Sequence, residues 1–167
     1  MSLHDHSEAL NDALNEARRV LEECGFVVVH ARPTGSAYYG RENPADFDVL
    51  VLIGEQATNR DSDSPAWATL KDDEVVPNAI KALAAHQYED CAYTAQEGDL
   101  GYEGEEYGSV WAAVRGGRIN IILTVSYEWY IRAAAATELT RRTSEVDGEV
   151  PPKDDIVEVF HICRFEE

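Results

Sequence analysis

Residues 34–40 read TGSAYYG and residues 46–53 read DFDVLVLI, and these two segments say most about the architecture of this chain. The second segment continues into an apolar run over 49–53 that ends before Gly54, which is typical of a buried β-strand. Side chains two positions apart in a strand point to the same face. Asp46 and Asp48 are therefore expected to lie side by side, with Phe47 facing the core.

Two carboxylates at the start of a strand indicate a cation site. Asp46 and Asp48 repel each other unless a cation lies between them. Mg²⁺, or Mn²⁺ in its place, accepts oxygen ligands and shares them with phosphates. Gly35 lets the backbone approach a phosphate closely, and the Ser36 hydroxyl can bind phosphate oxygens. The plainer alternative is a pair of solvated carboxylates at the start of a strand.

The rest of the sequence predicts one α+β domain over residues 1–167. Apolar residues at three- and four-residue spacing predict helices, and short β-branched runs predict strands. The expected elements are a helix over 7–24, strands over 26–30 and 46–53, a loop over 55–74, a helix over 76–85, a strand over 88–95, an acidic loop over 97–106, a hairpin of 110–114 with 119–124, and helices over 127–142 and from 151 onward. This order favours a mixed β-sheet with helices packed mainly on one face.

The order of elements and motifs resembles the polymerase-β-like nucleotidyltransferases. That family has a helix, a strand, a Gly-Ser turn and a second strand that bears acid-hydrophobic-acid. Gly35, Ser36, Asp46 and Asp48 match these parts, and the resemblance is closest over residues 7–54. It implies a nucleotidyltransferase-like domain that binds a nucleoside triphosphate with Mg²⁺ at these four residues.

A later strand departs from the family pattern. The family usually has a third acid there, which helps to activate the attacking hydroxyl, whereas this chain has Asn120. An amide can coordinate a metal, but it adds no negative charge and is a poor general base. We therefore take Asp46, Asp48 and Asn120 as the candidate catalytic residues and expect weak or lost nucleotidyl transfer. Through residues 118–122, RINII, and the alanine-rich helix after them, the chain also resembles small nucleotidyltransferase-like proteins of tailed bacteriophages.

The composition is strongly acidic. There are 32 Asp and Glu against 14 Lys and Arg, which gives a net charge of −18. Such a surface repels phosphates at long range and argues against non-specific nucleic-acid binding. Three explanations stay open: a surface that docks on a basic groove of a partner such as a nucleic-acid enzyme, adaptation to high salt, or a well-solvated surface without a partner. The first would make the chain a non-catalytic binding protein.

Cysteine usage and hydropathy predict a cytoplasmic protein without membrane contact. Cys24, Cys91 and Cys163 are far apart and show no metal-ligand spacing, so reduced, packed thiols are expected. No apolar run reaches the roughly 18 residues that a membrane span needs. The N-terminus lacks the basic and apolar regions of a signal peptide.

Overall fold

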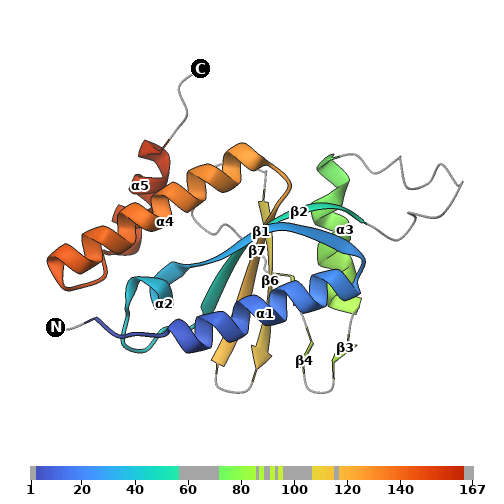
Figure 1. Ribbon diagram of the computed structural model, residues 1–167, viewed down its shortest axis with the longest axis horizontal. Coiled ribbons are helices and arrows are strands. Elements are labelled where there is room, and N and C mark those ends of the chain that lie inside the picture. The colour runs from blue at the N-terminus through green and yellow to red at the C-terminus, as the bar shows by residue number, and fades with distance from the viewer. Residues whose placement is uncertain are drawn as a thin grey trace, which may run out of the picture.

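The computed structural model describes residues 3–56, 72–85, 87–88, 91–92, 94–95, 107–114 and 117–163. Along the chain the elements are α1 (Ser7–Glu23), β1 (Phe26–Thr34), α2 (Gly35–Tyr39), β2 (Phe47–Gln56), α3 (Asp72–Ala85), β3 (Gln87–Tyr88), β4 (Cys91–Ala92), β5 (Thr94–Ala95), β6 (Tyr107–Val114), β7 (Gly117–Thr124), α4 (Tyr127–Asp147) and α5 (Lys153–Ile162) (Figure 1). Most of the predicted loop over 55–74 and all of the acidic segment 97–106 lie outside the described residues.

The main sheet is mixed, as the sequence predicted. Its strand order is β1-β2-β7-β6-β5. β2 and β7 are parallel, whereas β1 pairs with β2, β7 with β6, and β6 with β5 in the antiparallel sense. β3 and β4 form a separate two-stranded pair. The α+β class is therefore confirmed, and β2 lies inside the sheet with β1 at its edge.

Helices cover both faces of the sheet, whereas the sequence predicted a layer mainly on one face. Val49, Val51 and Ile53 of β2 belong to the core that includes buried side chains of α1 and α3. Leu50 and Leu52 point the other way, into a second core with side chains of α4 and α5. Because β2 is apolar at both its odd and its even positions, it needs a helical layer on each side. Figure 1 shows α4 and α5 together, apart from α1 and α3.

The helices begin and end where local chemistry allows. The α1 helix buries one apolar stripe, which consists of Leu10, Ala13, Ala17, Val20 and Leu21. The α4 helix begins after Ser126, whose hydroxyl accepts a hydrogen bond from the Trp129 amide at 3.1 Å. It ends at Gly148, whose φ of 75° is in the left-handed region that glycine tolerates. The described residues contain no helix long and apolar enough to cross a bilayer.

Two predicted boundaries were wrong near the candidate site. β1 continues past the expected end at residue 30, through Pro33 to Thr34. Proline is tolerated there because β1 is an edge strand and has no second neighbour that would need its amide. Gly35 and Ser36, which the resemblance implied to form a turn, instead begin α2, a single short helix. Together these two elements bring Gly35 to the start of β2.

Candidate functional site

The backbone of Gly35 lies directly against the carboxylate of Asp48. β1 ends at Thr34, which pairs with Asp48 of β2, so the next residue of the chain turns across the end of that strand. A Cβ atom added to Gly35 would lie 2.0 Å from Asp48 Oδ2, and the φ of Gly35 is +79°. Both the close approach and the backbone conformation require glycine here. The structure thus places Gly35 and Asp48 together, as the sequence predicted.

Asn120 is the second neighbour of Asp48. Parallel pairing of β2 with β7 sets the two residues opposite each other. The Asn120 amide nitrogen donates a hydrogen bond to Asp48 Oδ1 at 2.9 Å. Asn120 is only 4% exposed, and its carbonyl oxygen Oδ1 is buried without a hydrogen-bond partner. A buried, unpartnered acceptor is costly and is the kind of group that a bound ligand can satisfy.

Asp46 lies just before β2, and its partner is Arg118 of β7. The guanidinium contacts both carboxylate oxygens, with Nε 2.6 Å from Oδ1 and an Nη nitrogen 3.1 Å from Oδ2. Sequence reasoning gave Arg118 no role at the site. The sequence could have indicated its position, because Arg118 is two residues before Asn120 in a strand and therefore points to the same face as Asn120. The paired residues Asp46 and Arg118 therefore lie beside Asp48 and Asn120.

The electrostatics of the site centre on Asp48. Burial raises the pKa of its carboxyl to about 6, and the negative charge of Asp46 adds to the rise. The hydrogen bond from Asn120 and the positive charge of Arg118 act in the opposite direction and lower the pKa. The ionised form of Asp48 is thus poorly compensated by the protein alone. A cation bound beside it would favour that form.

Ser36 follows Gly35 in the first turn of α2. Its carbonyl oxygen accepts hydrogen bonds from the Gly40 amide at 3.1 Å and the Arg41 amide at 3.0 Å, which close the short helix. Gly40, with a φ of 104°, ends α2 in the left-handed region. Ser36 is therefore held next to Gly35 at the end of β1, although its expected contact with a phosphate stays a prediction.

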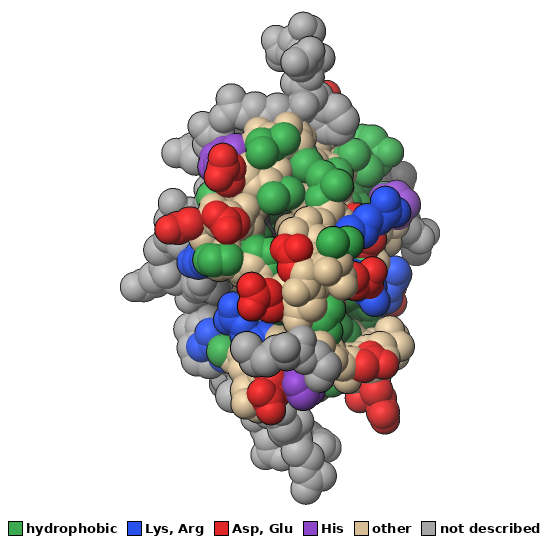
Figure 2. All heavy atoms as spheres, turned by 90° about the vertical axis from the view of Figure 1, so that its left-hand side faces the viewer, with side chains coloured by type: hydrophobic (Ala, Val, Ile, Leu, Met, Phe, Trp, Pro, Cys, Tyr) green, Lys and Arg blue, Asp and Glu red, His purple; other side chains and the backbone are tan. Residues whose placement is uncertain are grey.

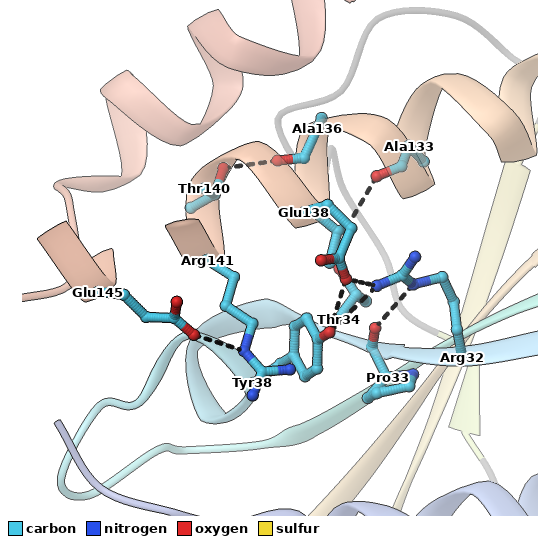
Figure 3. A network of polar contacts seen from close by, with 11 residues as sticks. Arg32, Pro33, Thr34, Tyr38, Ala133, Ala136, Glu138, Thr140, Arg141 and Glu145 are labelled. Atoms are coloured by element: carbon cyan, nitrogen blue, oxygen red, sulfur yellow. Dashed lines mark hydrogen bonds and ion pairs between the residues drawn. The ribbon is translucent and has the colours of Figure 1, made fainter. Parts of the chain in front are cut away.

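A polar network holds α2 against α4 (Figure 3). The Tyr38 hydroxyl donates a hydrogen bond to Glu138 at 2.6 Å, and Arg32 of β1 pairs with the same carboxylate. The Arg141 guanidinium carbon lies 4.3 Å from the centre of the Tyr38 ring. The hydroxyl hydrogen bond lowers the pKa of Glu138, with a further contribution from Arg32. This network fixes α2, and with it the position of Gly35.

The donor set of the site suits a hard cation. Asp46, Asp48 and Asn120 offer oxygen ligands, which Mg²⁺ and Mn²⁺ prefer, and Asn120 Oδ1 has no hydrogen-bond partner among the residues that the structure describes. The set supplies only two negatively charged ligands. The described part of the chain contains no group of three or more His, Cys, Asp or Glu side chains arranged to hold a metal. The residues fit one cation that also has ligands from elsewhere.

A separate cavity lies on another side of α2. It has a volume of about 330 Å³ and is lined by the N-terminal segment from Leu3 to Ser7, by α2 residues and by Arg141 and Glu145 of α4. Neither Asp46, Asp48 nor Asn120 lines it. This cavity beside α2 is thus not the place where the polar residues of the candidate site meet.

Comparisons with known proteins give a limited similarity to solved structures. No family model matches the chain, and no curated protein matches it. Among solved structures, one of the Cid1 poly(U) polymerase, described with Mg and 3'-dATP bound, is similar with a TM-score of 0.47 and 12% sequence identity. The similarity covers 87% of this chain but only 39% of that polymerase. No conclusion about activity follows from a similarity of this size, and none of the comparisons supports the likeness to bacteriophage proteins.

Proposed function

We propose that this chain is a single nucleotidyltransferase-like domain that binds a nucleoside triphosphate with Mg²⁺, and that its nucleotidyl transfer is weak or lost. The observation that supports it best is the packing of the Asp48 carboxylate on the Gly35 backbone, with the unpartnered Asn120 oxygen beside it. The arrangement is suited to a ligand that has both phosphate oxygens and a cation.

Each residue has a distinct role in this proposal. Asp46 and Asp48 would hold Mg²⁺, and Asn120 Oδ1 would supply a third oxygen. When bound, the cation would neutralise charge on the phosphates, which is a main requirement of phosphoryl transfer. Gly35 would let the phosphates approach the backbone, and Ser36 would donate its hydroxyl to them.

The expected weakness of transfer follows from Asn120. This residue takes the place at which a third carboxylate would complete the site, and it lies within hydrogen-bond distance of Asp48. An amide neither adds negative charge for a second metal nor accepts a proton from an attacking hydroxyl. Losing such a group costs about 10²-fold or more, on the scale of general-base contributions. Binding without efficient turnover is the result.

Calorimetric titration tests the binding part of the proposal. Wild-type protein should bind at least one of the four nucleoside triphosphates in the presence of Mg²⁺, and binding should raise the melting temperature. Asp48→Asn should abolish both effects. Asp12→Asn is the matched control, because it makes the same chemical change at an exposed position of α1. Absence of binding by the wild type with every triphosphate at millimolar metal would refute the proposal.

Transfer of label from α-labelled triphosphates tests the catalytic part. We expect little transfer by the wild type, none by Asp46→Ala and a gain in Asn120→Asp. Efficient wild-type transfer that is lost in Asp46→Ala would show that the site is intact, and the expectation of weak activity would then be wrong.

One observation favours a non-catalytic binding protein instead. Arg118 engages both oxygens of Asp46, as it would in a site that no longer needs a metal. The net charge of −18 would then serve contact with a basic partner. On the face shown in Figure 2, however, acidic side chains alternate with basic and apolar ones and form no single patch. Salt-sensitive binding to a basic nucleic-acid enzyme, with no binding of any triphosphate, would favour this alternative.

A further inference from the structure

We infer that Arg118 is the resident counter-ion of Asp46, and that a divalent metal enters the site only when phosphates of the ligand draw the guanidinium away. Metal and triphosphate would then bind together, each weak without the other. This inference rests on the proposed function and concerns the order in which its two ligands bind. It starts from the contact between Arg118 and Asp46.

The Asp46 carboxylate is fully engaged by the arginine. One oxygen is 2.6 Å from Nε and the other is 3.1 Å from an Nη nitrogen, which is the bidentate geometry that a guanidinium and a carboxylate favour. A metal that used Asp46 would have to approach the same oxygens. The two cations therefore compete for one carboxylate, and like charges cannot share it closely.

The oxygens left over are a poor site for a metal alone. Asp48 Oδ1 accepts the hydrogen bond from Asn120, and Asp48 Oδ2 lies against the Gly35 backbone. Asn120 Oδ1 is unpartnered but uncharged. With Arg118 in place, the ionised side chains of Asp46, Asp48 and Arg118 sum to one net negative charge. A strongly hydrated divalent cation gains little from such a site.

The position of Arg118 allows the exchange. Its side chain is 41% exposed, against 21% for Asp46, and its backbone is fixed in β7 next to β6. Rotation of this long side chain toward solvent breaks none of the backbone pairs that hold β7 between β2 and β6. An ion pair that is this accessible contributes little to stability, so a phosphate can compete with Asp46 for the guanidinium. The planar guanidinium also matches two phosphate oxygens well.

Removing the arginine should move the two ligands in opposite directions. Without the guanidinium, Asp46 is open to a metal, while the phosphates lose a cationic partner. In Arg118→Gln we therefore expect Mn²⁺ alone to bind about tenfold tighter than in the wild type, and inorganic triphosphate alone to bind about tenfold weaker. Wild-type protein should bind each ligand about 5- to 150-fold tighter when the other is present, the usual range of coupling between two sites. The variant should lose the part of this coupling that the guanidinium supplies and keep the part that direct contact between metal and phosphate supplies.

Two readouts on folded, full-length protein test this. Free Mn²⁺ is followed by its electron paramagnetic resonance signal, and inorganic triphosphate by calorimetry. Arg19→Gln is the matched control: it makes the same charge change in an exposed ion pair of α1, with Glu16 and Glu23, and should alter neither affinity. Arg118→Lys keeps the charge but not the bidentate contact, and its affinities for Mn²⁺ and for triphosphate should lie between those of the wild type and Arg118→Gln.

The outcomes separate the inference from the proposed function. Opposite shifts for the two ligands in Arg118→Gln, absent in Arg19→Gln, would support the inference. Equal affinity of Mn²⁺ for the wild type and for Arg118→Gln, with triphosphate binding intact, would overturn the inference and leave the proposed function standing. No binding of metal or triphosphate by any variant would overturn both.

Discussion

Replacing Gly35 with alanine is expected to destabilise the fold, because the new Cβ has no room. That atom would lie 2.0 Å from Oδ2, 2.7 Å from Cγ and 2.9 Å from Cβ of Asp48. These distances are far below van der Waals contact, so either the carboxylate or the end of β1 must move. The carboxylate cannot move freely, because its other oxygen accepts the hydrogen bond from Asn120.

The size of the effect follows from two contributions. Placing a Cβ at the φ of +79° that Gly35 adopts costs about 1–2 kcal/mol. Forcing an extra methyl group into a packed site costs about 1–3 kcal/mol more. Gly35→Ala should therefore lower the free energy of unfolding by about 2–5 kcal/mol. In a chain of this length, that corresponds to a melting temperature lower by roughly 5–15 °C.

Urea unfolding followed by tryptophan fluorescence measures the change, and Gly54→Ala is the control. Gly54 also lies in β2, but an added Cβ there would meet nothing closer than 3.6 Å, at Val27. The control should stay within about 1 kcal/mol of the wild type. In an Asp48→Ala background, the contacts with Oδ2 and Cγ disappear and only the 2.9 Å contact with Cβ stays, so the cost of Gly35→Ala should fall by about 1–2 kcal/mol.

Two results would refute this reasoning. Unfolding of Gly35→Ala at the urea concentration of the wild type would mean that Gly35 is not packed on Asp48. Alternatively, Gly35→Ala could cost the same in the wild-type and Asp48→Ala backgrounds, which would mean that the carboxylate is not what the new Cβ meets. Coupling between the two changes is the quantity that identifies the contact.

Two further predictions concern titration and the network around α2. Because burial raises the pKa of Asp48 to about 6 from its ordinary 3.8, the folded state keeps a proton that the unfolded chain loses, and stability should fall as the pH rises from about 4 to about 6. Asp48→Asn should remove this fall, and at pH 7 its free energy of unfolding should be about 1–3 kcal/mol higher than that of the wild type. Urea unfolding of both proteins from pH 4 to pH 7 measures the difference. A parallel pH dependence in the two proteins would contradict the prediction. Tyr38→Phe removes the hydroxyl that donates to Glu138 and should cost about 1–2 kcal/mol while raising the pKa of Glu138, observed by carboxyl NMR titration; an unchanged Glu138 pKa would show that the hydroxyl is not bound there.

Much of the fold could be predicted because the relevant signals are local. The apolar run over 49–53 predicted a buried strand, and the spacing of apolar residues over 7–24 predicted one helix with an apolar stripe. The hairpin of β6 with β7 followed from strand periodicity around a glycine pair. The short distance between Gly35 and Asp48 was also expected, because a chain that leaves one strand and enters its neighbour brings the two strand ends together. Patterns within a few residues sufficed for these features.

The sequence also specified which face each acid would occupy, but it left the contacts of these acids open. Period two in a strand puts Asp46 and Asp48 on one side whatever surrounds them. Which cation compensates them depends on the strand that lies next to β2. The sheet order places β7 there, in parallel and in a register that sets Asn120 opposite Asp48. The residues of β7 are about 70 positions away in the chain, and no local pattern fixes that register.

Tertiary structure alone therefore decided the chemistry of the site. It brought Arg118 onto Asp46, buried Asp48 enough to raise its pKa, and left the Asn120 oxygen without a partner. It also placed helices on both faces of the sheet, where the order of elements had predicted a layer mainly on one face. The physical reason is that ion pairing and desolvation depend on distances between groups remote in sequence, whereas periodicity reports only which way each side chain points.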